Sequence, residues 1–266
     1  MSQLVHRLVL VVALVLVLDG GAFADSFGHD PTTATPISPS SNSISGVIDP
    51  DVIQDWFSFE ALPYVPYVIT VTTGTIWDTM VWLKAPDGAL TLAVSNSVSA
   101  TGPASITLTN TGPVSTFYVG VGGFAEFTTG TYSLVVNQHA FADSNSNGIP
   151  DSWELLHLGT LTNSANTDYS GTGFTIYQDY LMGLDPTNAA SGLFITSIQQ
   201  QTNGAQVTWP AVQYGKYRVS FVTDLVNSIS WTPLATTNSL ATSFDTYSDF
   251  TASGATGRFY RVEFIY

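Results

Sequence analysis

Oxygen-bearing side chains alternate with other residues in the segment 143–154, which reads DSNSNGIPDSWE. Calcium takes about six to eight hard oxygens, which a curled loop of twelve residues can supply from positions 1, 3, 5, 7, 9 and 12, with a glycine at position 6 for the sharp turn. This segment has its glycine at position 6 and a long carboxylate at position 12. The predicted ligands are the side chains of Asp143, Asn145, Asn147, Asp151 and Glu154 and the carbonyl oxygen of Ile149.

A second segment with the same spacing follows at residues 168–179, DYSGTGFTIYQD. Its predicted ligands are the side chains of Asp168, Ser170, Thr172 and Asp179 and the carbonyl oxygen of Phe174. We expect this second loop to bind calcium more weakly than the first, because it has fewer carboxylates and its last ligand is the shorter aspartate. The alternative is an ordinary polar turn in which Asp143 caps the backbone. Such a turn does not require glycine at position 6 and an acid at position 12, so we predict Ca²⁺ as the cofactor.

Each of these loops precedes a short stretch with helical character, and Gly183 and Pro186 are suitable stop signals for the second one. No helix is expected before Asp143, because the preceding sequence YSLVVNQHAF reads as a strand. The region resembles the loop–helix calcium repeats of dockerins and thrombospondin type 3 repeats. The resemblance implies a calcium-binding linker rather than a sensor. Because the unit has few apolar residues, we expect the ion to stiffen the joint.

Short alternating strands dominate the region before the loops, from DWFSFEA to GTYSLVV, with turns at Thr73-Gly74 and Pro86–Gly88. This regular spacing of short strands and turns predicts an antiparallel β-sandwich. Residues 30–136 also resemble the bacterial pre-peptidase C-terminal domain, through TATPI, GVIDPDVIQDWFSF, VWLKAPDGAL, STFYVGVGGF and TGTYSLVV. The resemblance implies a small jelly-roll-like sandwich of the kind attached to secreted hydrolases, although no peptidase domain accompanies it here.

Alternation returns after Leu193, with a hairpin signal at Asn203-Gly204. This alternation predicts a second, smaller β-sandwich. The region also resembles a C-terminal β-module of secreted bacterial proteins, through the segments KYRVSFVTDLVNSISWTPLAT and RFYRVEF. The predicted fold class is mostly β, with two antiparallel β-sandwiches joined by a short calcium-binding loop–helix unit. The predicted domains are a signal peptide at 1–24, the first sandwich at 25–142, the paired calcium-binding unit at 143–190 and the second sandwich at 191–266.

The first residues have the features of a secretory signal peptide. Arg7 precedes an apolar run from Leu8 to Leu18, and AFA at 22–24 suits cleavage before Asp25. The alternative is an uncleaved anchor, but the run is short for a membrane span. We therefore predict a secreted, extracellular or cell-surface protein with no membrane span after cleavage.

The chain is acidic and lacks cysteine. Its 266 residues include six Lys and Arg, and its formal net charge is −14, which argues against nucleic acid and anionic membranes as partners. The absence of cysteine excludes disulfides and thiolate chemistry. Stability must therefore come from large cores or from bound metal.

Other candidate residues carry weaker signals. Asp30, Asp49, Asp51 and Asp55 could bind a further ion by analogy with some pre-peptidase C-terminal domains, but ordinary turn acids are the preferred interpretation. His29, His139 and His157 remain after cleavage, and no catalytic motif accompanies them. We predict no catalytic residue and no cofactor-binding residue besides the calcium ligands. The six tryptophans are expected in cores rather than on a sugar-stacking surface.

The predicted function is a secreted, non-catalytic, calcium-binding structural protein that associates with itself or adheres to an extracellular polymer. Self-association could occur by strand addition, through either the lead at 30–45 or the terminal strand RFYRVEFIY, unless both pair within their own domains. The alternative function is a carbohydrate- or protein-binding accessory module, which aromatic residues on one exposed face would favour. A hydrolase of an unrecognised type is a third and weaker alternative.

Overall fold

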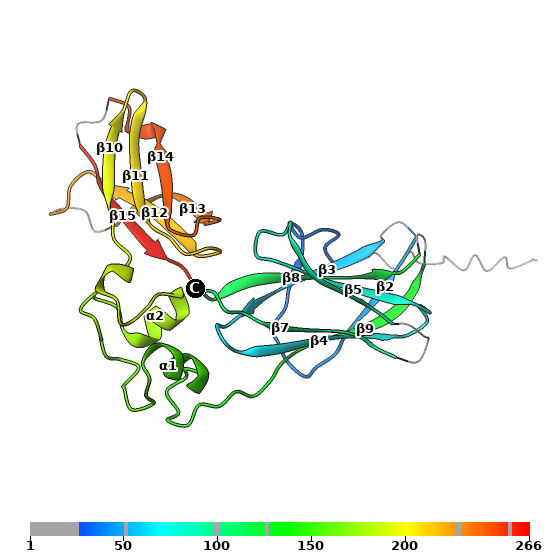
Figure 1. Cartoon of the computed structure of the whole chain (residues 1–266). Coiled ribbons are helices and arrows are strands. Elements are labelled where there is room, and N and C mark those ends of the chain that lie inside the picture. The colour runs from blue at the N-terminus through cyan, green and yellow to red at the C-terminus, as the bar shows by residue number, and fades with distance from the viewer. Residues whose placement is uncertain (1–26, 51–52, 98–101, 126–127, 227–229, 255–256) are drawn as a thin grey trace, which may run out of the picture.

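The computed structural model describes residues 27–50, 53–97, 102–125, 128–226, 230–254 and 257–266. Figure 1 shows two β-rich bodies, with the two α-helices beside the smaller, C-terminal one. The predicted signal peptide lies outside the described residues. No helix in the described part of the chain combines the length and apolar character needed to span a bilayer.

Two sheets form the N-terminal sandwich. The first contains, in spatial order, β1 (Thr35–Pro36), β3 (Gln54–Ala61), β8 (Ser115–Gly123), β5 (Thr79–Lys84) and β6 (Thr91–Asn96). The second contains β2 (Ile44–Ile48), β9 (Gly130–Gln138), β4 (Pro66–Thr73) and β7 (Ala104–Thr109). All the pairings are antiparallel except that of β1 with β3.

Alternating side chains build the core between these two sheets. In β4, for example, Tyr67, Ile69 and Val71 are buried, whereas the residues between them are half-buried. This is the pattern of a strand with one face on the core. The lead at 30–45 is not free, because β1 and β2 pair with β3 and β9 of the same chain. Both segments proposed for strand exchange thus have partners within their own domains, since β15 (Phe259–Phe264) also pairs with β12 (Lys216–Val222).

The loop–helix unit contains α1 (Asp151–His157) and α2 (Ile176–Met182). Helix α2 begins with a capping box, in which Thr175 and Gln178 bond each other's backbone N–H groups. It ends at Gly183, whose φ of 67° is the left-handed conformation expected of a C-terminal glycine. Helix α1 follows Pro150 and has no side-chain cap.

Apolar residues attach this unit to both sandwiches. Ile149, Trp153, Ile176, Tyr180 and Leu181 form a cluster that Val114 of the first sandwich completes, and Leu62, Tyr64 and Phe264 pack against it. The Tyr180 hydroxyl donates to the Pro63 carbonyl at 2.7 Å, and the Val114 N–H donates to the Leu181 carbonyl at 2.9 Å. The unit has few apolar residues, as expected, but those of both helices converge in one cluster that also contacts the two sandwiches.

The C-terminal body is a second sandwich of two three-stranded sheets. One contains β10 (Ser197–Gln201), β11 (Gly204–Pro210) and β14 (Phe244–Asp249), and the other β13 (Thr232–Asn238), β12 (Lys216–Val222) and β15 (Phe259–Phe264). Two short 3₁₀ turns, Ala189–Ser191 and Phe250–Ala252, accompany it. Its core includes the buried Trp209, Tyr217 and Val219. In Figure 1 the last strand, β15, runs to the C-terminus, which lies between α2 and the N-terminal sandwich.

The predicted fold class is confirmed, since the structure is mostly β with antiparallel sheets and two short helices. The hairpin predicted at Asn203-Gly204 joins β10 to β11. The domain bounds at 142 and 190 remain predictions.

Candidate metal centre

Asp143 organises the first loop by accepting backbone hydrogen bonds. Its Oδ1 accepts from the Asn147 N–H at 3.0 Å and its Oδ2 from the Gly148 N–H at 2.9 Å. Gly148 has a φ of 85°, the left-handed conformation that the sixth position of such a loop requires. The loop therefore curls around the carboxylate of its first residue.

Glu154 closes this loop from helix α1 and is fully buried. Its carboxylate accepts from the Asn145 Nδ2 at 3.1 and 3.2 Å and from the Asn147 Nδ2 at 3.0 Å. Among the described residues, no Lys or Arg forms an ion pair with it. A buried carboxylate held only by neutral amides lacks a compensating positive charge, which makes its surroundings favourable for a cation.

Asp151 is turned towards Ser144 instead. Its Oδ1 accepts from the Ser144 N–H at 2.8 Å and its Oδ2 from the Ser144 hydroxyl at 2.6 Å. The side chain of Ile149 is buried in the shared core, and its backbone N–H donates to the Asn147 Oδ1 at 2.8 Å. Its carbonyl oxygen remains a predicted ligand. The structure thus brings together Asp143, Asn145 and Asn147 with Glu154, and it gives Asp151 a separate partner.

Asp168 organises the second loop in the same way. Its Oδ1 accepts from the N–H groups of Gly171 at 2.8 Å and Thr172 at 3.0 Å, and its Oδ2 from the Gly173 N–H at 2.8 Å. Thr172 in turn accepts weakly from the Phe174 N–H at 3.4 Å. The two loops thus share one backbone design, although their sequences differ at most positions.

Asp179 closes the second loop with fewer partners. The side chain is 2% exposed, and its Oδ2 has no hydrogen-bond partner in the described part of the chain. The Ser170 hydroxyl, another predicted ligand, is also buried without a partner. Burial, followed by the nearby charges of Asp168 and Asp185, raises the pKa of Asp179 to about 6. Buried polar atoms normally find partners, so these two oxygens indicate a site where a cation would supply the missing interaction.

The donor chemistry of both loops suits calcium. All the predicted ligands are carboxylate, amide, hydroxyl or carbonyl oxygens, which calcium prefers, and none is the nitrogen or sulfur typical of zinc sites. Within the described residues, no group of three or more His, Cys, Asp or Glu side chains gathers at one point. A cation would therefore depend on the neutral oxygens of Asn, Ser and Thr as well as on the carboxylates.

Two residues near the loops were absent from the sequence-based ligand set. Ser144 binds both oxygens of Asp151, and Asp185 lies close enough to raise the pKa of Asp179. A serine one position after the first aspartate is a local signal that could have been noticed. The proximity of Asp185 depends on the chain reversal at Gly183, which the spacing alone does not give.

The other acidic cluster does not form one site in the described residues. Asp30 is exposed and binds Thr32 and Thr33 in its own turn, as an ordinary turn acid does. Asp55 differs from that expectation, because it is fully buried in β3 and accepts from the Tyr132 hydroxyl at 2.5 Å. Asp51 lies outside the described residues.

The histidines are separated from one another in the fold. His29 and His139 are both exposed; His29 precedes β1 by several residues, and His139 directly follows β9. His157 packs on Trp153, with ring centroids 4.6 Å apart, and burial lowers its pKa. His157 therefore has a packing role against Trp153.

The tryptophans divide between cores and surface. Trp56, Trp153 and Trp209 are buried, as expected for core residues. Trp82 and Trp231 are half-buried, and Trp77 is 63% exposed. The expectation that tryptophans occupy cores thus holds for half of them.

Comparison with known proteins found weak matches to solved structures. No protein-family model matches the chain, and no curated protein matches it. Among solved structures, the pre-peptidase C-terminal domain of the Bacillus anthracis collagenase is 16% identical, with a TM-score of 0.33 over 39% of this chain and 93% of that domain. A periplasmic inhibitor of g-type lysozyme from Aeromonas hydrophila is 12% identical, with a TM-score of 0.27 over 40% of this chain and 96% of that protein.

A glycoside hydrolase domain, Endo-D from Streptococcus pneumoniae R6, matches 77% of this chain and 28% of that one, at 7% identity and a TM-score of 0.22. At this degree of similarity, function must be inferred from the residues of this chain itself.

Proposed function

We propose that this chain is a secreted, non-catalytic structural protein in which calcium, bound by residues 143–154 and 168–179, stabilises the joint between two β-sandwiches. The observation that carries the proposal is the pair of buried carboxylates, Glu154 and Asp179, each of which closes a twelve-residue oxygen-rich loop and forms no ion pair with a Lys or Arg among the described residues. Secretion, which the signal-peptide features of residues 1–24 predict, would expose the protein to extracellular calcium.

The position of the loops explains what the ion would do. Both loops lead directly into helices whose apolar residues form the core shared with Val114 and Phe264 of the two sandwiches. An ion that fixes the loops would also fix Trp153 and Tyr180, and so the junction. Calcium would act as a structural clamp rather than as a catalyst or a switch.

We also propose that the protein adheres to an extracellular polymer or associates with itself. Strand exchange receives no support from the pairings, because β1, β2 and β15 all pair within their own chain. Any association would therefore use assembled surfaces, including the outer strands β6, β10 and β13. Light scattering with calcium separates a monomer from an assembly.

Calcium titration by isothermal calorimetry tests the calcium proposal. Chelator-treated protein should bind calcium with dissociation constants of about 10⁻⁴ to 10⁻³ M, as extracellular modules do. Glu154→Gln and Asp179→Asn should each remove or weaken one binding event. The matched control is Asp87→Asn, which removes an exposed turn carboxylate that binds the Ala89 and Leu90 N–H groups. Absence of binding, or equal binding by all four proteins, would refute the proposal.

A further inference from the structure

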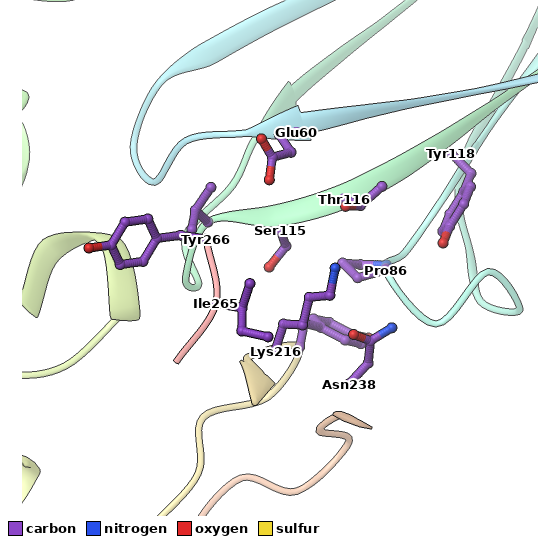
Figure 2. Close-up of a pocket in the computed structure, with 11 residues that line it drawn as sticks. Glu60, Pro86, Ser115, Thr116, Tyr118, Lys216, Asn238, Ile265 and Tyr266 are labelled. Carbon is purple, nitrogen blue, oxygen red and sulfur yellow. The ribbon is translucent and has the colours of Figure 1, made fainter. Parts of the chain in front are cut away.

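A small cavity lies where the two sandwiches meet, away from both loops. Its volume is about 190 Å³. The first sandwich contributes Glu60, Thr116 and Tyr118 to its wall, and the second contributes Tyr214, Lys216 and Asn238. In Figure 2, Glu60, Ser115 and Lys216 approach the same space from different strands, and the Tyr266 ring points away from it. A cavity of this size suits one small ring rather than a drug-sized ligand.

The polar groups of this cavity can both donate and accept hydrogen bonds. Lys216 is an obligate donor, Glu60 an acceptor, and Asn238 can do both. Neither Glu60 nor Lys216 takes part in an ion pair among the described residues. Their charges are opposite, so the cavity selects neither an anion nor a cation. A neutral ligand with several hydroxyl groups matches these donors and acceptors.

Tyr214 occupies this wall in a strained backbone conformation. Its φ is 67°, in the left-handed region that is unfavourable for a non-glycine residue. Hydrogen bonds fix it on both sides: its N–H donates to the Ser239 carbonyl at 2.7 Å, and the Gly215 N–H donates to the Val212 carbonyl at 3.0 Å. Glycine would fit the same turn without strain, so the tyrosine side chain must have a use there.

The other strained tyrosine, Tyr64, has an evident packing role. Its φ is 58°, and its side chain packs against the shared core and makes an edge contact with His157. Tyr214 belongs to none of the core clusters formed by the described residues. Its ring is half-buried at the cavity. Strain that packing does not explain points to a ligand.

Further aromatic side chains continue from the cavity along the outer face of the first sheet. Tyr118 of β8 lies opposite Lys84 of β5, and Trp82 is two residues away from Lys84 on the same face. Both rings are half-buried, whereas the alternate residues Val81, Leu83 and Val119 point into the core. Tyr118 and Trp82 are therefore diagonal neighbours on one accessible surface.

We propose that this cavity binds one ring of a neutral saccharide, and that the strip formed by Tyr118 and Trp82 supports the next ring of the same chain. The apolar C–H face of a pyranose packs on aromatic rings, and its hydroxyl groups pair with Glu60, Lys216 and Asn238. Glu60 is the single acidic side chain in the wall. Glycoside hydrolysis ordinarily needs a pair of carboxyl groups, so the site binds a saccharide without cleaving it.

Saturation-transfer NMR and calorimetry on the full chain test this site, with cellobiose, maltose and chitobiose as probes at millimolar concentration. At least one probe should bind. Tyr214→Gly should weaken that binding by about tenfold or more, as expected for the loss of an aromatic contact, without lowering the melting temperature. The second readout separates ligand binding from packing, because a structural tyrosine would lower the melting temperature when removed.

Two further variants complete the experiment. Lys216→Met should also weaken binding, because it removes a donor and keeps the length of the side chain. Phe250→Ala is the matched control, since this aromatic ring is 71% exposed and is not among the described residues that line the cavity, and its affinity should stay within about twofold of the wild type. Absence of binding by all three probes would overturn the proposal, as would unchanged binding by Tyr214→Gly and Lys216→Met. Calcium binding by the loops would be unaffected by either result.

Discussion

The two oxygen-rich loops share one backbone design but differ in how their final carboxylates are held. In the first loop, Asn145 and Asn147 donate their amide N–H groups to Glu154. In the second loop, one oxygen of Asp179 has no donor at all, and the charge of Asp168 lies close to it. Two loops with the same spacing thus differ: neutral amide groups donate hydrogen bonds to the final carboxylate of the first loop, but one oxygen of the final carboxylate of the second loop receives none from the described residues.

This difference shows how a metal-free loop can keep its shape. The asparagine amides of the first loop can present N–H to Glu154, and by turning over they can present oxygen to a cation. The second loop has Ser170 and Thr172 at the corresponding positions, and the Ser170 hydroxyl reaches no partner. We therefore expect the first loop to be ordered with or without calcium. In the second loop, we expect the buried charge of Asp179 and its repulsion by Asp168 to destabilise the folded state until an ion binds.

The largest effect should come from the core to which both loops are attached. Trp153→Ala removes a fully buried ring that packs against Tyr180 and His157. It should lower the free energy of unfolding by about 3–5 kcal/mol, with calcium or with chelator. Urea unfolding measures this value. Leu156→Ala is the control, because that side chain is 65% exposed and its loss should change stability by no more than about 0.5 kcal/mol. A similar small change for both variants would mean that the two loops do not share a supporting core.

The second effect is the calcium dependence of the first loop. With free calcium at about ten times the dissociation constant, binding should add about 1.4 kcal/mol to the free energy of unfolding. Glu154→Gln should lose most of this increment, because it removes the charge and the bidentate grip but keeps the size of the side chain. In chelator the variant should be at least as stable as the wild type, since a buried charge has been removed. Urea unfolding in both conditions measures this difference, and a variant destabilised equally in both would indicate a purely structural Glu154.

A smaller calcium effect, with a distinct pH dependence, is expected at the second loop. In chelator, Asp179→Asn should raise stability at pH 7, because it removes a buried charge beside Asp168 and Asp185. The folded pKa of Asp179, about 6, lies above its ordinary value of 3.8, so the folded state binds more protons between these two pH values. The free energy of unfolding should therefore fall as pH rises through this window, and the variant should lack this slope. Denaturant unfolding from pH 4 to pH 7 tests the sign; parallel profiles for both proteins would contradict it.

The smallest effect should be that of Ser144→Ala. The Ser144 hydroxyl donates to Asp151 at 2.6 Å on the exposed side of the first loop. Loss of this hydroxyl should lower the free energy of unfolding in chelator by about 0.5–1.5 kcal/mol. Calcium affinity should stay nearly unchanged, because Asp151 binds Ser144 rather than the interior of the loop. Calcium titration of the variant checks this expectation. A clear increase in affinity would contradict it, because it would show that Asp151 is a calcium ligand that Ser144 holds away from the ion.

Local patterns predicted the parts of the site that depend on sequence spacing. The curled turn at Gly148 and the return of Glu154 from helix α1 both lie within one twelve-residue segment, so counting positions was sufficient. The same counting assigned Asp151 to the ion, because it could not weigh the competing partner Ser144. Period-2 patterning likewise predicted the strands of both sandwiches.

Contacts between distant segments could not be predicted in this way. Val114 and Phe264 meet Trp153 only because the two sandwiches and the helices pack together in three dimensions. The cavity between Glu60 and Lys216 has the same origin. No local signal in the sequence marks either arrangement, and the backbone strain of Tyr214 becomes visible only once the turn is built.

The most direct test of the account is calorimetric melting of the wild-type chain with saturating calcium and with chelator. Because both loops lead into helices whose core is shared by the two sandwiches, calcium should raise the melting temperature of the whole chain by about 3–6 °C for a stabilisation near 1.4 kcal/mol. Identical melting curves in the two conditions would show that residues 143–154 and 168–179 are polar turns and that no ion clamps the joint.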